Sequence, residues 1–113
     1  MKYDGLDANA LSARLGVSDC VALEQVTSTL DIIHQLAEEG APRGTLVLAD
    51  EQVKGRGRQS RHWHSPRGAG VWLGSLQRPV APVEGGVLAI RAGICLVRAL
   101  ADLDVVAKLK WPN

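Results

Sequence analysis

Hydrophobic residues recur every three or four positions in three segments of the chain, which is the spacing of one helix face. The pattern predicts helices over residues 8–15, 29–39 and 86–102. Asp7 and Gly16 flank the first segment and suit the N-cap and C-terminal positions of a helix. Ser28 or Thr29 is placed to cap the second helix. The apolar face predicted for this second helix consists of Leu30, Ile33, Leu36 and Ala37.

Four other segments lack the helical period and are rich in residues that favour strands. They predict strands over residues 21–26, 45–49, 71–76 and 105–109. Residues 45–49 form a nearly continuous apolar run, which is typical of a strand buried on both faces. Because strands and helices alternate, the expected class is α/β or α+β.

Residues 51–70 show neither period and contain four glycines and a proline. A loop of this length is uncommon in a compact domain unless it has a function. The surrounding composition supports a function, because no acidic residue occurs between Gln52 and Val83. The same window holds six of the thirteen basic residues: Lys54, Arg56, Arg58, Arg61, Arg67 and Arg78. A local field of this kind attracts phosphate or carboxylate groups.

The overall composition excludes other classes of protein. The chain has 113 residues and a formal net charge of +1, so it is not polyanionic or histone-like. Its hydrophobic content of 46% argues against disorder and fits one domain or part of one. No run of apolar residues is long enough for a membrane helix, and the N-terminus does not read as a signal peptide. Cys20 and Cys95 are expected to be buried free thiols in a reducing cytoplasm.

Glycines alternating with arginines in the long loop allow backbone N–H groups and guanidinium groups to approach an anion together. The segment from Gly55 to Ser60 lacks the closing elements of a phosphate-binding P-loop and of a dinucleotide fingerprint. From the residues alone, three readings remain: a nucleotide or other anion site, a nucleic-acid-binding segment, or a solvated basic loop.

The order of motifs along the chain is more specific. The loop reads Gly55-Arg56-Gly57-Arg58, then Arg61, Trp63, Ser65-Pro66, Gly68 and Gly70, and Lys110-Trp111-Pro112-Asn113 follows about forty residues later. This series resembles the catalytic domain of the biotin protein ligase family over residues 21–113. The resemblance implies a mixed sheet flanked by helices, as in lipoate ligases and class II aminoacyl-tRNA synthetases. It also implies a cytoplasmic enzyme that uses ATP and Mg²⁺ to form biotinyl-5′-AMP. The enzyme then transfers biotin to one lysine of a biotin carboxyl carrier domain.

The same resemblance assigns roles to individual residues. The resemblance assigns biotin binding to Ser28, Thr29, Gln52, Arg56, Gly57 and Arg58. Of these, Ser28, Thr29 and Gln52 would hold the ureido head group. The catalytic residues among the six are Arg56 and Arg58, which would close over the biotin carboxylate and the adenylate phosphate. Nucleotide-binding roles fall to Arg58, Arg61, Trp63 and Asn113, the last near the triphosphate and its magnesium.

The chain departs from the family pattern at two positions within these motifs. Ser60 stands where glycine is usual, so the loop is strained if the backbone there needs a positive φ. Leu30 replaces the usual asparagine after the Ser28-Thr29 pair.

We expect residues 1–20 to be a helical lead-in and residues 21–113 a catalytic domain truncated at its C-terminal end. Because no DNA-binding helix-turn-helix is expected, we expect neither DNA binding nor repressor function. We also expect no membrane partner. A nucleic-acid-binding module and a lipoate protein ligase are the alternatives.

Overall fold

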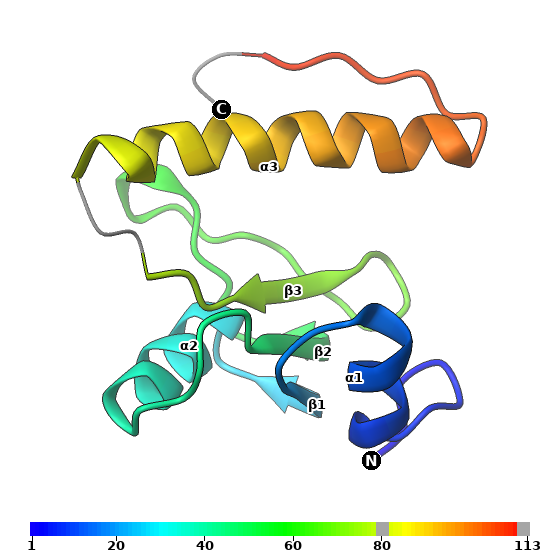
Figure 1. The fold of residues 1–113 in the computed structure, drawn as a ribbon, viewed down its shortest axis with the longest axis vertical. Helices are drawn as coiled ribbons and strands as arrows, with labels where there is room; N and C mark the ends of the chain where they lie inside the picture. The colour runs from blue at the N-terminus through cyan, green and yellow to red at the C-terminus, as the bar shows by residue number, and fades with distance from the viewer. Residues whose placement is uncertain (79–81, 111–113) are drawn as a thin grey trace. The chain divides into compact units, whose positions relative to one another are not determined.

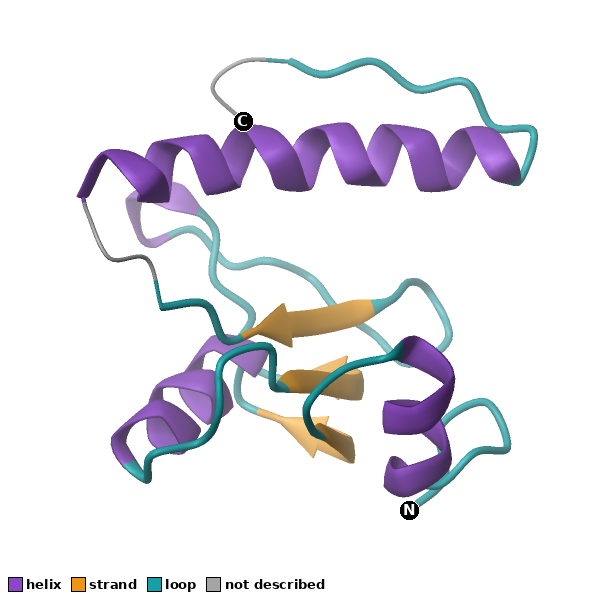
Figure 2. Cartoon of the chain, viewed as in Figure 1, coloured by secondary structure: helices purple, strands orange, loops and turns teal. Residues whose placement is uncertain are grey.

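The computed structural model describes residues 1–78 and 82–110, which belong to two compact units, Met1–Gln77 and Arg78–Asn113. The first unit contains α1 (Ala8–Leu15), β1 (Cys20–Val26), α2 (Thr29–Glu38), β2 (Leu46–Gln52), a 3-10 turn (Arg58–Ser60) and β3 (Trp72–Ser75) (Figure 1). The second contains α3 (Pro82–Asp102). Figure 2 shows that helices and strands alternate along the first unit, as the sequence predicts.

The two short helices are closed by the residues that the sequence indicates. The Asp7 carboxylate accepts a hydrogen bond of 2.8 Å from the backbone N–H of Ala10, and α1 ends at Gly16 with φ of 67°. Ser28 is the N-cap of α2, and its hydroxyl oxygen accepts from the backbone N–H of Leu30 at 3.2 Å. These contacts satisfy amide groups that a helix leaves unpaired at its N-terminus.

The sheet has the strand order β1-β2-β3 and is mixed, which confirms the predicted fold class. β1 pairs with β2 in parallel, from Cys20 opposite Leu46 to Val26 opposite Gln52. β2 pairs with β3 in the antiparallel sense, as in the pair Ala49 and Trp72. The parallel strands are joined through α2, the usual crossover for such a pair.

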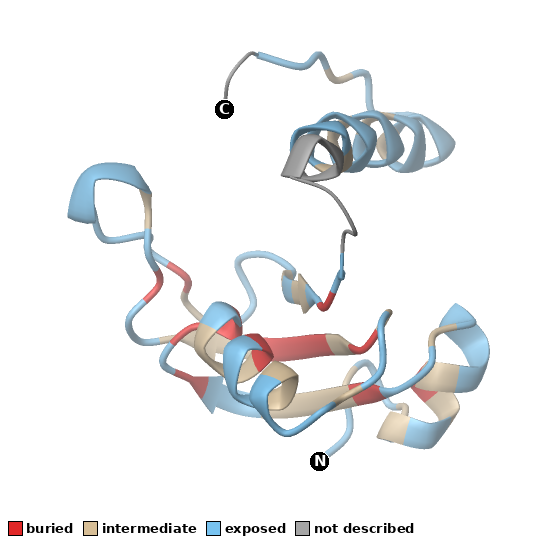
Figure 3. Ribbon diagram, turned by 60° about the vertical axis from the view of Figure 1, so that its left-hand side comes forward, coloured by how far each residue is buried: buried red, intermediate tan, exposed pale blue. Residues whose placement is uncertain are grey.

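The core has two hydrophobic clusters that use alternate residues of β2. Val47 packs with Ile33 of α2 and with Leu76, whereas Leu48 packs with Leu11 of α1 and with Cys20. Successive side chains of a strand point to opposite faces, so α1 and α2 cover different faces of the sheet. Figure 3 shows the buried residues concentrated along this central strand, which confirms the predicted buried run over 45–49.

The predicted apolar face of α2 is wrong at one position. Leu30 is 48% exposed, and the buried residues of α2 are Thr29 and Ile33. The face that contacts the sheet therefore begins one residue earlier than hydrophobicity suggests. The small side chain of Thr29 faces Gly74 of β3, where a Cβ atom would lie 3.4 Å from the Thr29 Cβ.

In the second unit, α3 begins at Pro82, four positions before the predicted start at Gly86. Proline suits the first turn of a helix, where its missing N–H group has no partner to lose. The helix ends at Asp102, and Asp104 in the following turn is left-handed with φ of 59°. The N–H of Val105 donates to the carbonyl of Leu100 at 2.8 Å. Gly93 contacts the side chain of Leu109, so the segment after this turn returns along the helix.

The predicted strand over 105–109 is wrong, because residues 105–110 have no regular secondary structure. An apolar pattern becomes a strand only when a neighbouring strand pairs with it, and no described strand pairs with this segment.

The expectation that both cysteines are buried is half right, since Cys20 is 3% exposed but Cys95 is exposed. Across residues 1–78 and 82–110, none of the helices combines the length and apolar character needed to cross a membrane.

Candidate functional site

The parallel pairing of β1 and β2 brings two polar segments to one edge of the sheet. Val26 lies opposite Gln52, and pairing continues beyond the strands, because the N–H of Val53 donates to the Val26 carbonyl at 2.9 Å. Ser28 and Thr29 follow β1 with only Thr27 between, whereas Gln52 is the last residue of β2. Residues far apart in sequence therefore meet at the carboxyl ends of adjacent parallel strands, where α/β proteins commonly bind ligands.

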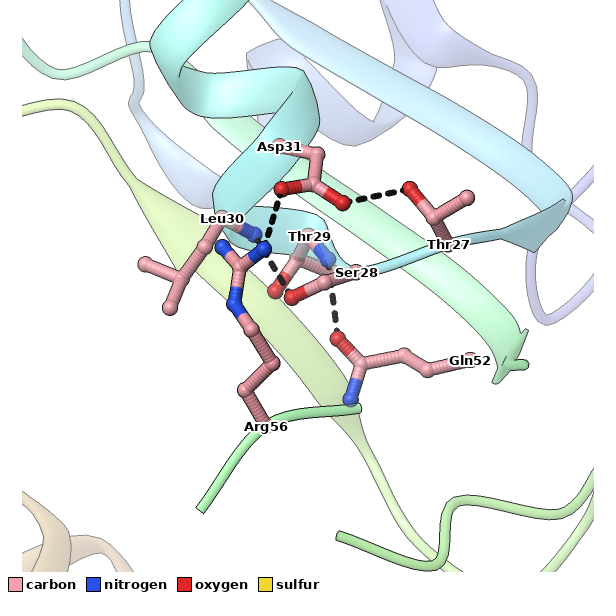
Figure 4. A network of polar contacts seen from close by, with 7 residues as sticks. All are labelled: Thr27, Ser28, Thr29, Leu30, Asp31, Gln52 and Arg56. Atoms are coloured by element: carbon pink, nitrogen blue, oxygen red, sulfur yellow. Dashed lines mark hydrogen bonds and ion pairs between the residues drawn. The ribbon is translucent and has the colours of Figure 1, made fainter. Parts of the chain in front are cut away.

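Ser28, Thr29 and Gln52 form a polar group at the N-terminus of α2 (Figure 4). Ser28 is 2% exposed and Thr29 is 6% exposed, which is unusual for hydroxyl residues. The backbone N–H of Thr29 donates to the Gln52 side-chain oxygen at 2.8 Å. Within the described ranges no acceptor is assigned to the hydroxyl hydrogen of Ser28 or Thr29, so both can donate to a ligand. The structure thus brings together the three residues expected to hold the head group.

The other end of the Gln52 amide contacts Ser65. Gln52 Nε2 donates to Ser65 Oγ at 3.0 Å, and the backbone N–H of Gln52 donates to the Ser65 carbonyl at 3.0 Å. A pocket of about 280 Å³ is lined by Gln52 and Ser65 together with His62, His64 and Pro66. Ser65 is only 2% exposed, so its hydroxyl is a buried part of this wall.

The predicted loop contains a short hairpin over residues 55–63. The N–H of Gly57 donates to the Arg61 carbonyl at 2.8 Å, and the N–H of Trp63 donates to the Gly55 carbonyl at 2.7 Å. At its tip, Gln59 and Ser60 are both left-handed, with φ of 58° and 59°. The strain expected for a serine at position 60 is therefore present in this backbone. The Gly57 N–H is engaged within the hairpin, so its expected contact with biotin needs this bond to open.

The side chain of Arg56 extends from the hairpin to the first turn of α2. Its Nη1 lies 2.6 Å from Asp31 Oδ1, while the Thr27 hydroxyl donates to Asp31 Oδ2 at 2.6 Å (Figure 4). The Thr27 hydroxyl and then the Arg56 guanidinium lower the pKa of Asp31 from its ordinary value. This side-chain pair puts a guanidinium beside the polar group of Ser28, Thr29 and Gln52.

The remaining predicted site residues are not part of this group. Arg58, Arg61 and Trp63 lie on the exposed hairpin, with 56% of Trp63 exposed. In the part of the chain that the structure describes, none of these three side chains makes a hydrogen bond or ion pair with the polar group. Asn113 lies outside the described residues.

Two residues of the site were not singled out by the sequence. Asp31 reads as an ordinary acidic residue in the first turn of a helix, and its position 25 residues before Arg56 gives no sign of contact. Ser65 belongs to the Ser-Pro motif, but its contact with Gln52 depends on the return path of the loop. The assembled site offers neutral donors and acceptors beside a cation, which suits a ligand with a polar uncharged head and an acidic group.

Comparison with known proteins gives a consistent family. Residues 22–113 match the model of the biotin/lipoate A/B protein ligase family. The chain is 37% identical over 111 residues to the bifunctional ligase/repressor BirA of Bacillus spizizenii, which covers 96% of the chain and 33% of that relative. The chain thus spans about a third of that relative's length.

Two solved structures share the fold. The biotin protein ligase of Aquifex aeolicus, in complex with biotin and ATP, has a TM-score of 0.67 and 33% identity over 83% of this chain and 39% of that one. The biotin protein ligase of Leishmania major, in complex with biotinyl-5-AMP, has a TM-score of 0.54 and 28% identity over 83% of this chain and 45% of that one.

Proposed function

Because the chain belongs to the biotin/lipoate A/B protein ligase family, we propose that it is part of a biotin protein ligase. In this proposal, biotin and ATP form biotinyl-5′-AMP, and biotin then passes to a lysine of a biotin carboxyl carrier domain. We assign residues 21–113 to the catalytic domain and residues 1–20 to a helical lead-in. The free thiols of Cys20 and Cys95 suit a reducing compartment, and we propose the cytoplasm.

The observation that carries the proposal is the buried polar group beside Arg56. Ser28 and Thr29 offer hydroxyl groups, and Gln52 offers an amide with both a donor and an acceptor. The biotin ureido ring is uncharged and carries one carbonyl and two N–H groups, so these side chains can satisfy it. The biotin carboxylate would then lie toward the guanidinium of Arg56, and toward the Gly57 backbone.

In the first step, a carboxylate oxygen of biotin attacks the α-phosphorus of ATP, and pyrophosphate leaves with the electron pair of the broken bond. Both reacting groups are anionic, so their repulsion raises the barrier unless cations neutralise it. We assign this role to Arg56 and Arg58, which are held on one hairpin and carry the charge permanently. Arg56 must exchange Asp31 for the substrate to do so.

We place the nucleotide on the exposed side of the hairpin. Arg61 and Arg58 would pair with phosphates, and Trp63 has an exposed ring face that can stack on adenine. Asn113 would lie near the triphosphate. ATP enters as its Mg²⁺ complex; the described residues contain no cluster of three histidine, cysteine or acidic side chains that could hold a metal ion, so no step is assigned to protein-bound magnesium.

In the second step, the uncharged ε-amine of the carrier lysine attacks the acyl carbon of biotinyl-5′-AMP. An amide bond forms, the bond to phosphate oxygen breaks, and AMP leaves with its electron pair. The lysine nitrogen loses one proton to the solvent. No covalent bond to the enzyme is required, because the adenylate is already an activated acid.

The test is formation of biotinyl-5′-AMP from biotin and α-labelled ATP with Mg²⁺, followed by transfer to a carrier domain. Arg56→Ala and Arg58→Ala are each expected to slow adenylate formation by about a hundredfold. Arg43→Ala, in an exposed turn, is the matched control and should retain the rate. Adenylation of lipoate in place of biotin would assign the chain to the lipoate branch. Salt-sensitive binding of single-stranded nucleic acid without any adenylate would contradict the enzyme proposal.

A further inference from the structure

Ser65 is joined to the candidate site by a continuous chain of hydrogen bonds. Its hydroxyl donates to the Trp63 carbonyl at 3.1 Å and accepts from Gln52 Nε2 at 3.0 Å. Gln52 Oε1 in turn accepts from the backbone N–H of Thr29 at 2.8 Å. The chain therefore runs from the arginine hairpin, through Ser65 and Gln52, to the N-terminus of α2.

The direction of these bonds is fixed at both ends. A backbone carbonyl can only accept, so the Ser65 hydroxyl hydrogen points to Trp63 and its lone pair faces Gln52. A backbone N–H can only donate, so the Gln52 oxygen faces Thr29. Rotating the amide by half a turn would place two donors together at Thr29, and two such groups cannot bond.

The residues that form these hydrogen bonds are also tightly packed. A Cβ atom on Gly55 would lie 2.4 Å from the Trp63 carbonyl oxygen, 2.9 Å from Ser65 Oγ and 3.1 Å from Gln52 Nε2. Only glycine leaves room for these three atoms at this position. The packing limits the alternative positions that the Gln52 amide could adopt.

We propose that Ser65 is a positioning residue that fixes the orientation of the Gln52 amide toward the biotin ureido ring. The amide then presents its NH₂ edge on the Ser65 side and its carbonyl edge on the Thr29 side. The NH₂ group can donate to a ligand carbonyl, and the amide oxygen can accept from a ligand N–H. This inference rests on the proposed function for the identity of the ligand, whereas the orientation itself rests on the hydrogen bonds.

The test compares Ser65→Ala with Ser75→Ala. Ser75 Oγ accepts from Gln77 Nε2 at 2.9 Å, so the control removes the same kind of bond at an exposed position. Ser65→Ala is expected to raise the KM for biotin about tenfold with kcat nearly unchanged, because binding is lost equally from ground and transition states. It should also discriminate less between biotin and 2-iminobiotin, whose ring carbonyl is replaced. Ser75→Ala should match the wild type.

A double-variant cycle separates positioning from general loosening. Once Gln52→Ala is present, adding Ser65→Ala should weaken biotin binding no further, since Ser65 acts through Gln52. If Ser65→Ala does not fold, Ser65→Cys replaces it in the test. It keeps only a weak acceptor and donor, so it should bind biotin more weakly than the wild type. Unchanged KM in a folded Ser65→Ala variant, or additive losses in the cycle, would overturn the inference.

The side-chain NMR signals of Gln52 test the orientation without any substrate. In the wild type its two amide hydrogens should differ in exchange rate, and Ser65→Ala should remove this difference. If the wild type forms no biotinyl-5′-AMP, the proposed function fails, while the NMR result still decides whether Ser65 orients Gln52. If it forms adenylate but the amide signals do not respond to Ser65→Ala, the inference fails alone.

Discussion

The guanidinium of Arg56 lies against the carboxylate of Asp31, with 2.6 Å between Nη1 and Oδ1. Both side chains are partly exposed, at 50% and 38%, so the pair can exchange partners with a solvated ligand. An acidic ligand that needs Arg56 therefore competes with a carboxylate already supplied by the first turn of α2. If Arg56 binds the ligand as proposed, Asp31 is expected to lower the affinity for an acidic ligand, although Asp31 itself does not bind it.

Asp31→Asn should strengthen the binding of biotin by about two- to fivefold, because the competitor for Arg56 loses its charge and exposed ion pairs are weak. Isothermal titration at low and physiological salt measures the change, which should shrink as salt rises. Asp50→Asn is the matched control, since Asp50 pairs with Arg67 at 2.9 Å instead. Weaker biotin binding in Asp31→Asn would mean that Asp31 orients Arg56 for the ligand.

The protonation of Asp31 gives a second prediction. Hydrogen bonds from Thr27 and Arg56 to the charged carboxylate lower its pKa, so the contact contributes to stability above the ordinary carboxyl pKa and is lost as the pH falls through the lowered value. Thr27→Val should raise the pKa of Asp31 by removing the first of these bonds. Carbon-13 NMR titration of the carboxyl group measures this, and an unchanged midpoint would contradict it.

Ser60→Gly should raise the free energy of unfolding by up to about 1 kcal/mol. Ser60 has φ of 59°, a conformation that costs a residue with a Cβ about 1 kcal/mol and costs glycine little. Urea denaturation measures the change. The same substitution at Ser75, the last residue of β3, should lower stability, because glycine loses more conformational freedom on folding. A loss of stability in Ser60→Gly would show that its side chain supports the turn.

Gly74→Ala should destabilise the first unit by about 1–3 kcal/mol, because the added Cβ would lie 2.9 Å from Ile33 Cγ1 and force α2 away from β3. Since α2 carries Ser28 and Thr29 at its start, biotin affinity should fall as well. Gly86→Ala in α3 is the control, where nothing lies within 4 Å of the added atom. Equal unfolding midpoints for the two variants would contradict the close contact between α2 and β3.

The sequence was sufficient to predict elements whose signals are local. The caps at Asp7 and Ser28 need only neighbouring residues, and the buried strand over 45–49 follows from its uninterrupted apolar run. The strand predicted over 105–109 failed because strand formation depends on a partner, which an apolar pattern does not specify. The 55–63 hairpin escaped prediction because its exposed residues show no alternation and its left-handed turn uses Gln59 and Ser60 rather than Asn-Gly.

For the candidate site, the motif order indicated Ser28, Thr29, Gln52 and Arg56, and the structure brings these four together (Figure 4). The motif could not indicate how they are connected. The contacts of Asp31 and Ser65 link residues 25 and 13 positions apart, so they depend on how the chain returns to the site. The roles of these four motif residues are predictions, as are those of Gly57, Arg58, Arg61, Trp63 and Asn113.

Val26 pairs with Gln52, so the distance between Ser28, Thr29 and Gln52 depends on the register of β1 against β2. A deletion of one residue within β1 or β2 would shift one strand past the other and turn alternate side chains to the wrong face. By contrast, inserted residues in the turn over 40–44 would lie beyond the opposite ends of the strands, at the far side of the sheet. The chain can therefore vary in length there while Ser28 and Gln52 stay in place.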